Sequence, residues 1–327
     1  MYSPDSAFTG RHPVVGAYPS GMNRARSNEQ FDFVLCFSQH IFDYEKAGKK
    51  GSAANYRASF RLLLSYLNGM RLTPRQFTVR WVELYERWLR ARGVSANTVI
   101  FHLRNLRAVY NRAVRKRLIP ASHVNPFGQL TVRQTATRKR ALSRANLKRI
   151  VDLDLSSYHP KYALARDIFL FSFFTRGMSF VDMCYLRTGN IRNGVLTYVR
   201  HKTGQTLLMS IEPQLQRLID RYRNASPYIL PILAKDDSYT NYRQQQRELN
   251  KFIRKIGVLL NLPEPLTFYV ARHSWATLAR DCGTPLTVIS AGMGHTSERT
   301  TRIYLTRSQY HRPGQSQNYR SVKKPVL

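Results

Sequence analysis

Acidic side chains are scarce in this chain of 327 residues. Asp and Glu number 19 against 52 Lys and Arg, which gives a formal net charge of +33 at pH 7. Both halves of the chain carry the excess, so it is not the property of a basic tail. Repulsion between so many like charges opposes a compact fold unless a polyanion neutralises them. The composition therefore predicts that the partner is a nucleic acid.

Cysteine and long apolar runs are scarce as well. Cys36, Cys184 and Cys282 lie far from one another and from any histidine at a metal-ligand spacing, so we expect buried free thiols and neither a disulfide nor a metal site. The longest apolar run, at about 168–174, is far shorter than the roughly 20 residues of a membrane-spanning helix. No secretory segment opens the chain. These absences predict a cytosolic protein without membrane contact.

The first part of the chain is a polar leader followed by helices. Residues 1–27 combine Gly, Pro, Ser and basic residues without apolar periodicity, which indicates a flexible leader. Apolar residues then recur at helical spacing and predict a helical domain over 28–120. Its helices are expected at about 31–42, 52–67, 79–92 and 95–117. Ser52 and Ser95 are the expected N-caps of the second and fourth helices.

Proline and glycine interrupt the helical pattern near residue 120. Residues 121–140 are therefore predicted to form a basic linker, followed by a second domain over 141–308 and a tail over 309–327. Six basic residues are candidate DNA contacts: Arg115, Lys116 and Arg117 at the end of the fourth helix, and Arg138, Lys139 and Arg140 in the linker. A merely solvated connector explains the linker equally well.

The second domain is predicted to combine helices with a small sheet. Residues 163–174 are apolar on nearly every side, which is typical of a helix buried at the centre of a core. β-Branched residues over 195–200 and 206–211 predict an antiparallel β-hairpin. Further helices are expected at about 213–223, 241–258, 268–281, 286–291 and 298–308. The predicted fold class is mainly α, with a helical N-terminal domain and a mixed α+β second domain.

Three short segments of the second domain carry groups suited to phosphate chemistry. In the first, Gly177 ends the apolar helix, and Ser179 with Asp182 three residues later opens the next one. Arg176 therefore stands in a tight turn, where its donors can face an anion together with the amides of a helix start. On its own, an arginine in such a turn is more often simply solvated.

The second segment is a helix over 268–281 with Thr267 as its expected N-cap. Tyr269, Arg272 and His273 stand at i, i+3 and i+4, so they share one face and are expected to converge on one small volume. Packing in the core is an alternative explanation for the rings of Tyr269 and His273. A buried guanidinium, however, needs an anionic partner.

The third segment, 292–304, joins a glycine-rich turn to a short helix. His295 follows Gly292 and Gly294, which allow close approach of the backbone, and Tyr304 lies nine residues after His295. Taken singly, this histidine and this tyrosine are unremarkable surface or core residues.

Together, in this order and spacing, the segments resemble the catalytic domain of the tyrosine recombinases, also called the phage integrase family. The similar stretch runs from about 142 to 306, and the domain over 28–120 resembles the family's core-binding domain. The matches are Thr175-Arg176-Gly177 to the T-G-x-R turn, Lys202 to the hairpin lysine, Tyr269, Arg272 and His273 to the H-x-x-R-H box, Met293-Gly294-His295 to L-G-H, and Tyr304 to the nucleophile. The stretch 271–277 is similar to that of short Bacteroidales integrases and DNA invertases.

The resemblance implies a role for each matched residue. Tyr304 would attack the phosphate and form a 3′-phosphotyrosine, while Arg176 and Arg272 clamp the phosphate and His295 adds a donor. Lys202 would protonate the departing 5′-hydroxyl as general acid.

The box departs from the family at its first position. Tyr269 stands where the family has histidine, and a tyrosine hydroxyl donates hydrogen bonds but is a poor base near neutral pH, so no general-base role is expected there. His273 would support the site.

The resemblance also implies the partners of the chain. These are double-stranded DNA with specific recombination sites and three further copies of the chain, which would form a homotetramer on two sites. No metal, ATP or other cofactor is implied, and the expected location is the bacterial cytoplasm, at the nucleoid. Two alternatives remain: a type IB topoisomerase, which uses the same tyrosine chemistry on one strand, and a DNA-binding protein of this fold that has lost catalysis.

Overall fold

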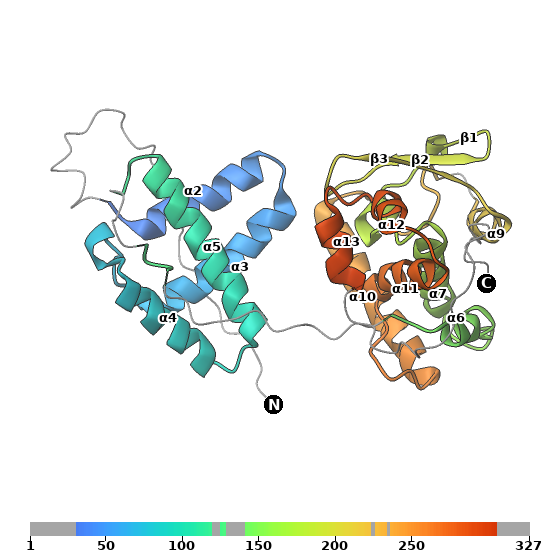
Figure 1. The fold of residues 1–327 in the computed structure, drawn as a ribbon, viewed down its shortest axis with the longest axis horizontal. Helices are drawn as coiled ribbons and strands as arrows, with labels where there is room; N and C mark the ends of the chain where they lie inside the picture. The colour runs from blue at the N-terminus through green and yellow to red at the C-terminus, as the bar shows by residue number, and fades with distance from the viewer. Residues whose placement is uncertain (1–30, 120–124, 129–140, 224–225, 234–235, 306–327) are drawn as a thin grey trace. The chain divides into compact units, whose positions relative to one another are not determined.

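The computed structural model describes residues 31–119, 125–128, 141–223, 226–233 and 236–305 (Figure 1). The chain divides into two compact units, residues 1–136 and 137–327. The predicted leader 1–27, the linker cluster of Arg138, Lys139 and Arg140, and the predicted tail 309–327 lie outside the described residues.

The first unit is helical, as predicted. Its helices are α2 (Phe33–Lys46), α3 (Lys50–Leu67), α4 (Val79–Ala91) and α5 (Ala96–Arg115), with a 3-10 turn η1 (Pro74–Gln76) between α3 and α4. Ser95 caps α5, since its side chain accepts a hydrogen bond from the backbone of Thr98. The prediction for Ser52 is wrong: α3 begins at Lys50, and Lys49 occupies the N-cap position because its carbonyl accepts the hydrogen bond from Ala53.

Aromatic rings fill much of the core of this unit. Phe33 lies 4.9 Å from Phe77 between ring centroids, and Phe77 stacks on Tyr110 at 4.8 Å. Phe127, which the sequence places in the linker, packs 5.7 Å from both Phe77 and Tyr110 and is buried. The short described segment 125–128 therefore contributes to the core of the first unit.

The second unit surrounds one central helix. Its elements are α6 (Arg144–Val151), α7 (Pro160–Phe174), α8 (Phe180–Cys184), η2 (Thr188–Asn190), β1 (Ile191–Arg192), β2 (Val195–Val199), β3 (Thr206–Ser210), α9 (Pro213–Arg221), α10 (Tyr239–Leu259), α11 (Phe268–Asp281), α12 (Leu286–Gly292) and α13 (Glu298–Leu305). The helices α10 and α11 pack along α7, and the three strands lie along one edge of the unit (Figure 1). The mainly α fold with a small antiparallel sheet is confirmed.

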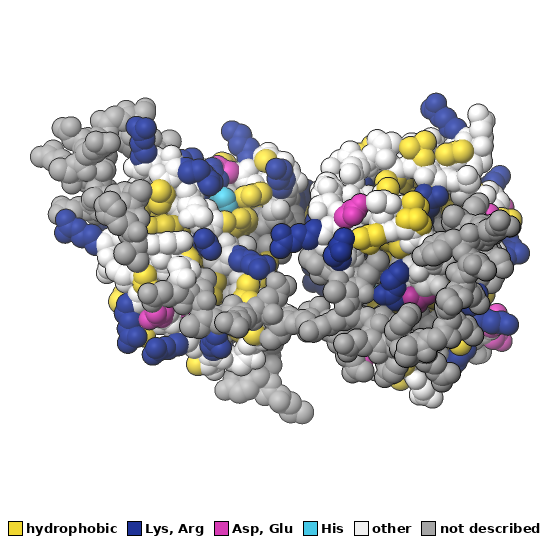
Figure 2. Space-filling model, in the orientation of Figure 1, with side chains coloured by type: hydrophobic (Ala, Val, Ile, Leu, Met, Phe, Trp, Pro, Cys, Tyr) yellow, Lys and Arg dark blue, Asp and Glu magenta, His cyan; other side chains and the backbone are white. Residues whose placement is uncertain are grey.

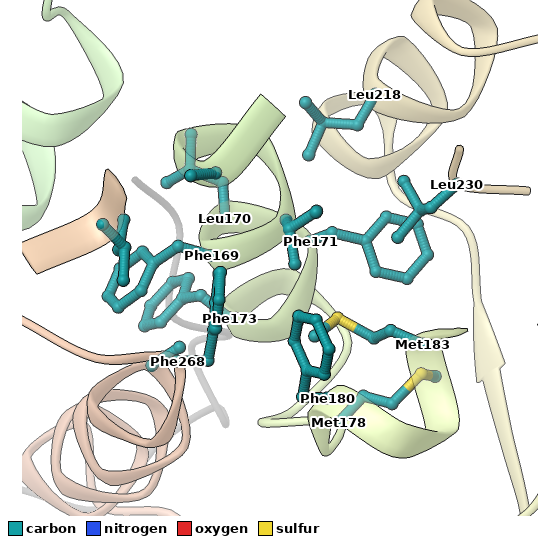
Figure 3. Close-up of a cluster of buried hydrophobic side chains, with 14 of the residues drawn as sticks. Phe169, Leu170, Phe171, Phe173, Met178, Phe180, Met183, Leu218, Leu230 and Phe268 are labelled. Atoms are coloured by element: carbon teal, nitrogen blue, oxygen red, sulfur yellow. The ribbon is translucent and has the colours of Figure 1, made fainter. Parts of the chain in front are cut away.

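The burial of α7 follows from its composition. Figure 3 shows Phe169, Phe171 and Phe173 directed into the surrounding core, where Phe268 from α11 and Met183 from α8 meet them. Such a helix has no polar face to turn to solvent, so neighbours must cover it on all sides. It thereby fixes the positions of α8 and α11, whose ends carry the predicted site.

The sheet has the order β1-β2-β3, and all pairs are antiparallel. The β2–β3 hairpin has the predicted location, with Val199 opposite Thr206. The backbone of Arg200 closes the connecting loop: its N–H donates to the carbonyl of Gln205 at 2.8 Å, and its carbonyl accepts from the N–H of Gly204 at 2.8 Å. Lys202 lies in this loop and is exposed.

The cysteines are free thiols, as expected, but not all three are buried. Cys36 and Cys184 lie in the cores of the two units, whereas Cys282 is partly exposed at the end of α11. Within the described parts of the chain, no helix is both long and apolar enough to cross a membrane.

Candidate active site

Arg272 is the best-anchored member of the predicted site. It lies on α11, and only 4% of its surface is exposed. Its guanidinium donates to the carbonyl of Gly177 at 2.6 Å and to the carbonyl of Met293 at 2.7 Å. A third contact runs from Nη2 to Nε2 of His295 at 2.9 Å. Arg272, which belongs to the second of the three segments that the sequence singled out, therefore connects it to the first and the third.

The turn between α7 and α8 approaches α11 so closely that only glycine fits at position 177. A Cβ atom on Gly177 would lie 2.7 Å from Cγ and 2.8 Å from Cα of Arg272, and the φ angle of Gly177 is +78°. Arg176 also has a positive φ, of +60°. Its side chain passes Gly292, because Cδ of Arg176 lies 3.4 Å from the position of a Cβ there. Arg176 and Arg272 thus extend toward the same turn after α12.

His295 is held from both sides of its ring. A guanidinium only donates, so Nε2 of His295 accepts from Arg272 and Nδ1 carries the proton. Nδ1 then donates to Oγ1 of Thr301, at 2.8 Å, on the first half of α13. Burial, followed by the charges of Arg272, Arg200 and Lys202, lowers the pKa of His295 to about 4. The imidazole is therefore neutral at pH 7.

The hairpin loop meets His295 from another direction. Arg200, which is buried, donates from Nη1 to the carbonyl of Gly294. Gly294 has a φ of +61°, and a Cβ atom there would lie 2.9 Å from Cδ1 of Leu207. Lys202 is near enough for its charge to depress the pKa of His295. The structure therefore brings Lys202, Arg272 and His295 into one neighbourhood.

The carboxylate of Asp182 fixes the other side of the loop. It accepts from the backbone of His201 at 2.8 Å and from the hydroxyl of Ser179 at 2.7 Å. Ser179 stands at the predicted N-cap of α8, yet its side chain caps no backbone group. The sequence identified Asp182 as a helix start but not as a support for the loop of Lys202, because a contact across 19 residues has no local signature.

The other two residues of the predicted box form a separate contact. The rings of Tyr269 and His273 meet edge to face, with centroids 4.7 Å apart, and Tyr269 is 55% exposed. Arg272, by contrast, turns inward to Gly177, Met293 and His295. The structure thus shows two separate contacts for the three predicted side chains. Tyr269 and His273 meet at the surface, and Arg272 makes its contacts in the interior.

Tyr304 belongs to the last described helix. The backbone over α13 is helical to Leu305, and the side chain of Tyr304 lies outside the described part. Thr301 precedes it by three residues and is fully buried. The contact of Thr301 with His295 therefore fixes which face of the described part of α13 is turned to the site.

Exposed basic side chains lie on both units. Figure 2 shows Lys and Arg scattered over the described surface, with few acidic side chains among them. Arg115, Lys116 and Arg117 are all exposed at the end of α5, where the sequence predicts DNA contacts. A hollow of about 570 Å³ lies over α10 between residues such as Arg247, Lys251 and Arg254, and no predicted site residue lines it. Among the described residues, no group of three or more His, Cys, Asp or Glu side chains is arranged to hold a metal ion.

Comparisons with known proteins find matches to one family in both parts of the chain. Residues 32–130 match the model of the phage integrase SAM-like domain, and residues 140–311 match that of the phage integrase family. The tyrosine recombinase XerC of Mesorhizobium japonicum is 25% identical over 220 residues, which are 65% of this chain and 69% of that protein. XerC of Agrobacterium fabrum is 22% identical over 66% of this chain and 69% of its own length.

Solved structures share the fold. The Tn1549 transposon integrase in complex with transposon right end DNA has a TM-score of 0.64 at 14% identity and covers 86% of this chain and 96% of its own. A lambda integrase tetramer bound to a Holliday junction has a TM-score of 0.65 at 14% identity and covers 94% and 85%.

Proposed function

The chain belongs to the phage integrase family of tyrosine recombinases, and we propose that it cuts and rejoins duplex DNA with Tyr304 as the nucleophile. Membership makes the protein a site-specific DNA recombinase, an enzyme that transfers DNA strands. One observation carries the proposal for Tyr304. The hydrogen bonds from Arg272 to His295 and from His295 to Thr301 attach α13, the helix of Tyr304, to the buried arginine.

The proposed cleavage is a single displacement at phosphorus. The hydroxyl oxygen of Tyr304 forms a bond to phosphorus and its proton leaves to water, while the bond to the 5′ oxygen breaks and Lys202 gives that oxygen a proton. Arg176 and Arg272 donate to the non-bridging oxygens, where charge builds up in the transition state. The phosphotyrosine conserves the bond energy, so rejoining needs no ATP, and the arginines supply the charge that a metal ion supplies elsewhere.

His295 requires one change before it can donate to the phosphate. In the DNA-free protein its Nε2 accepts from Arg272, and its pKa is about 4. A phosphate that enters beside the ring favours the charged imidazole and raises this pKa. We propose that His295 gains a proton as DNA binds and then donates from Nε2.

Two further residues of the box have supporting roles in the proposal. The exposed Tyr269 offers its hydroxyl to the phosphate as a donor, and His273 holds its ring through their edge-to-face contact.

DNA contact and assembly complete the proposed function. Residues 28–120 and 141–308 would each bind the duplex, 121–140 would connect them, and Arg115, Lys116, Arg117, Arg138, Lys139 and Arg140 would contact backbone phosphates. Recombination joins two sites, so four copies are proposed to act together in the bacterial cytoplasm, at the nucleoid. The similar fold of a lambda integrase tetramer on a Holliday junction supports this assembly. The mass of the complex on a synthetic junction, measured by light scattering, tests it.

A trapping experiment tests the nucleophile. Wild type, Tyr304→Phe and Tyr239→Phe are incubated with suicide duplexes that carry the inverted repeats nearest the gene, and denaturing gels are searched for a covalent protein–DNA band. Wild type and Tyr239→Phe should give the band, because Tyr239 lies at the start of α10, where its ring contacts Tyr242, which is not a site residue. Tyr304→Phe should not give the band. DNA binding without a covalent band on all duplexes would favour a non-catalytic protein. A two-site assay then separates recombination from nicking and closing.

A further inference from the structure

Arg200 is a buried cation with no role in the cleavage described above. Only 7% of its surface is exposed, and none of the ion pairs between described residues includes it. Removing a guanidinium from water is costly, so such a position calls for compensating contacts. The carbonyl of Gly294 supplies one, and a Cβ atom on Gly294 would lie only 3.0 Å from Cδ of Arg200.

The backbone of Arg200 closes the loop that presents Lys202. Its N–H donates to Gln205, and its carbonyl accepts from Thr203 at 3.3 Å and from Gly204 at 2.8 Å. Only His201 separates Arg200 from Lys202, so the orientation of Arg200 sets the start of the loop.

The side chain of Arg200 ends on the turn of His295. Gly294 is the residue directly before His295, and Thr203 adds a contact to the same carbonyl at 3.5 Å. Arg272 holds the adjacent carbonyl, that of Met293. Two arginines from different elements thus fix successive carbonyls of this turn. Arg272 reaches it from α11, and Arg200 reaches it from the β2–β3 hairpin.

We propose that Arg200 is a positioning residue that holds the loop of Lys202 against the turn of His295, so that the proton donor and the phosphate-binding groups act on the same phosphate. The assignment rests on the proposed cleavage step. Arg200 itself touches no reacting atom; it acts through Lys202. Its loss should therefore impair protonation of the leaving group more than formation of the bond to Tyr304.

The first test is made on the DNA-free protein. The pKa of His295 is followed by NMR in wild type, Arg200→Met and Arg192→Met, the last removing an exposed arginine from the neighbouring strand β1. Arg200→Met should raise this pKa, because a nearby positive charge is lost, and Arg192→Met should leave it unchanged. An unchanged pKa in Arg200→Met would overturn the contact.

The second test separates positioning of the acid from general damage to the fold. Covalent complex formation is compared on a normal duplex and on one with sulfur in place of the bridging 5′ oxygen at the scissile phosphate. A thiol has a pKa of about 8.5, so sulfur leaves without protonation. Arg200→Met should lose about 100-fold on the oxygen duplex, the order of a general acid's contribution, and return to near wild-type rate on the sulfur duplex.

Two further variants sharpen the outcome. Lys202→Met should show the same rescue, and the double variant should be no slower than Lys202→Met alone, because both changes disable one step. Arg200→Lys should retain part of the rate. Equal losses of Arg200→Met on both duplexes with an active wild type would overturn the positioning role alone. A wild type that forms no covalent complex on either duplex would overturn the proposed function and this assignment together.

Discussion

Single residues decide whether the buried arginine reaches its partners, and Gly177 is the clearest case. Any side chain at this position meets the backbone of Arg272, and the positive φ adds strain for an L residue. Gly177→Ala should therefore destabilise the second unit by about 1–3 kcal/mol. It should also slow covalent complex formation, since Arg272 must shift.

The matched control is Gly189→Ala. Gly189 has open space around its missing Cβ and no positive φ, so this change should stay within about 0.5 kcal/mol. Urea denaturation of both variants measures the difference. Equal midpoints for the two variants would contradict the close approach of the turn to α11.

Thr301 is a second residue whose single contact matters. Thr301→Val keeps the shape but removes the acceptor for Nδ1–H of His295, and an unsatisfied donor costs about 1–3 kcal/mol. The imidazole is expected to move its proton to Nε2, which then no longer accepts from Arg272. Nitrogen NMR of His295 should show the change of tautomer, and covalent complex formation should slow by about 10-fold, the equivalent of 1.4 kcal/mol.

Thr301→Ser restores a hydroxyl and Thr300→Val alters only the exposed neighbour, so both should resemble wild type. A wild-type tautomer in Thr301→Val would show that the hydroxyl does not orient the ring.

At the scale of elements, α7 contains one buried charged side chain, Asp167, which is 1% exposed. It accepts from Arg166 at 2.9 Å, from Arg221 at 2.7 Å and from the hydroxyl of Tyr222 at 2.8 Å, and so attaches the end of α9 to α7. Breaking a buried pair by removing one partner leaves the other charge uncompensated. Asp167→Asn should therefore cost about 3–5 kcal/mol in the second unit.

The control lies on α9 itself. Asp220 pairs with Arg223 at the surface, where both side chains are about half exposed or more, so Asp220→Asn should cost at most about 1 kcal/mol. Urea denaturation followed by circular dichroism compares the two. If Asp167→Asn were as stable as Asp220→Asn, the attachment of α9 to α7 would not depend on this carboxylate.

The elements also show what sequence patterns can predict. Long periodic segments such as 79–92 and 268–281 became helices close to their expected bounds, and the β-branched runs became the hairpin. The helix α6 and the strand β1 were not predicted: α6 has eight residues, and β1 has two whose strand character comes from pairing with β2. Ser52 was assigned as an N-cap from its residue type alone, although the helix had already begun.

In the site, too, local sequence patterns predict some residues and miss those whose role depends on tertiary contacts. The spacing of Arg272 and His295 follows from local sequence, and the structure brings them into contact. Arg200 and Thr301 have no sequence signal, because their roles come from tertiary contacts, of Arg200 with Gly294 and of Thr301 with His295. Sequence patterns therefore predicted the groups suited to the chemistry and missed those that hold them.

For the whole molecule, the net charge of +33 predicts how DNA binding depends on salt. Each phosphate that the protein neutralises releases counterions, so a contact with about 6–10 phosphates lowers affinity by about 10³–10⁵-fold between 50 and 200 mM salt. Fluorescence anisotropy with Tyr304→Phe, which is expected not to form the covalent complex, measures this slope on a random duplex. A shallow slope would contradict a backbone contact of this size.

Local contact and overall charge can be separated with two triple variants of equal charge. Replacing Arg115, Lys116 and Arg117 by Ala removes exposed cations at the proposed contact, and the salt slope should fall by about 1 for each. Replacing Arg57, Arg80 and Arg223 by Ala removes cations that already pair with carboxylates, so the slope should change little. Equal effects would show that the end of α5 acts only through the net charge, because a contact with phosphate depends on where the cations lie.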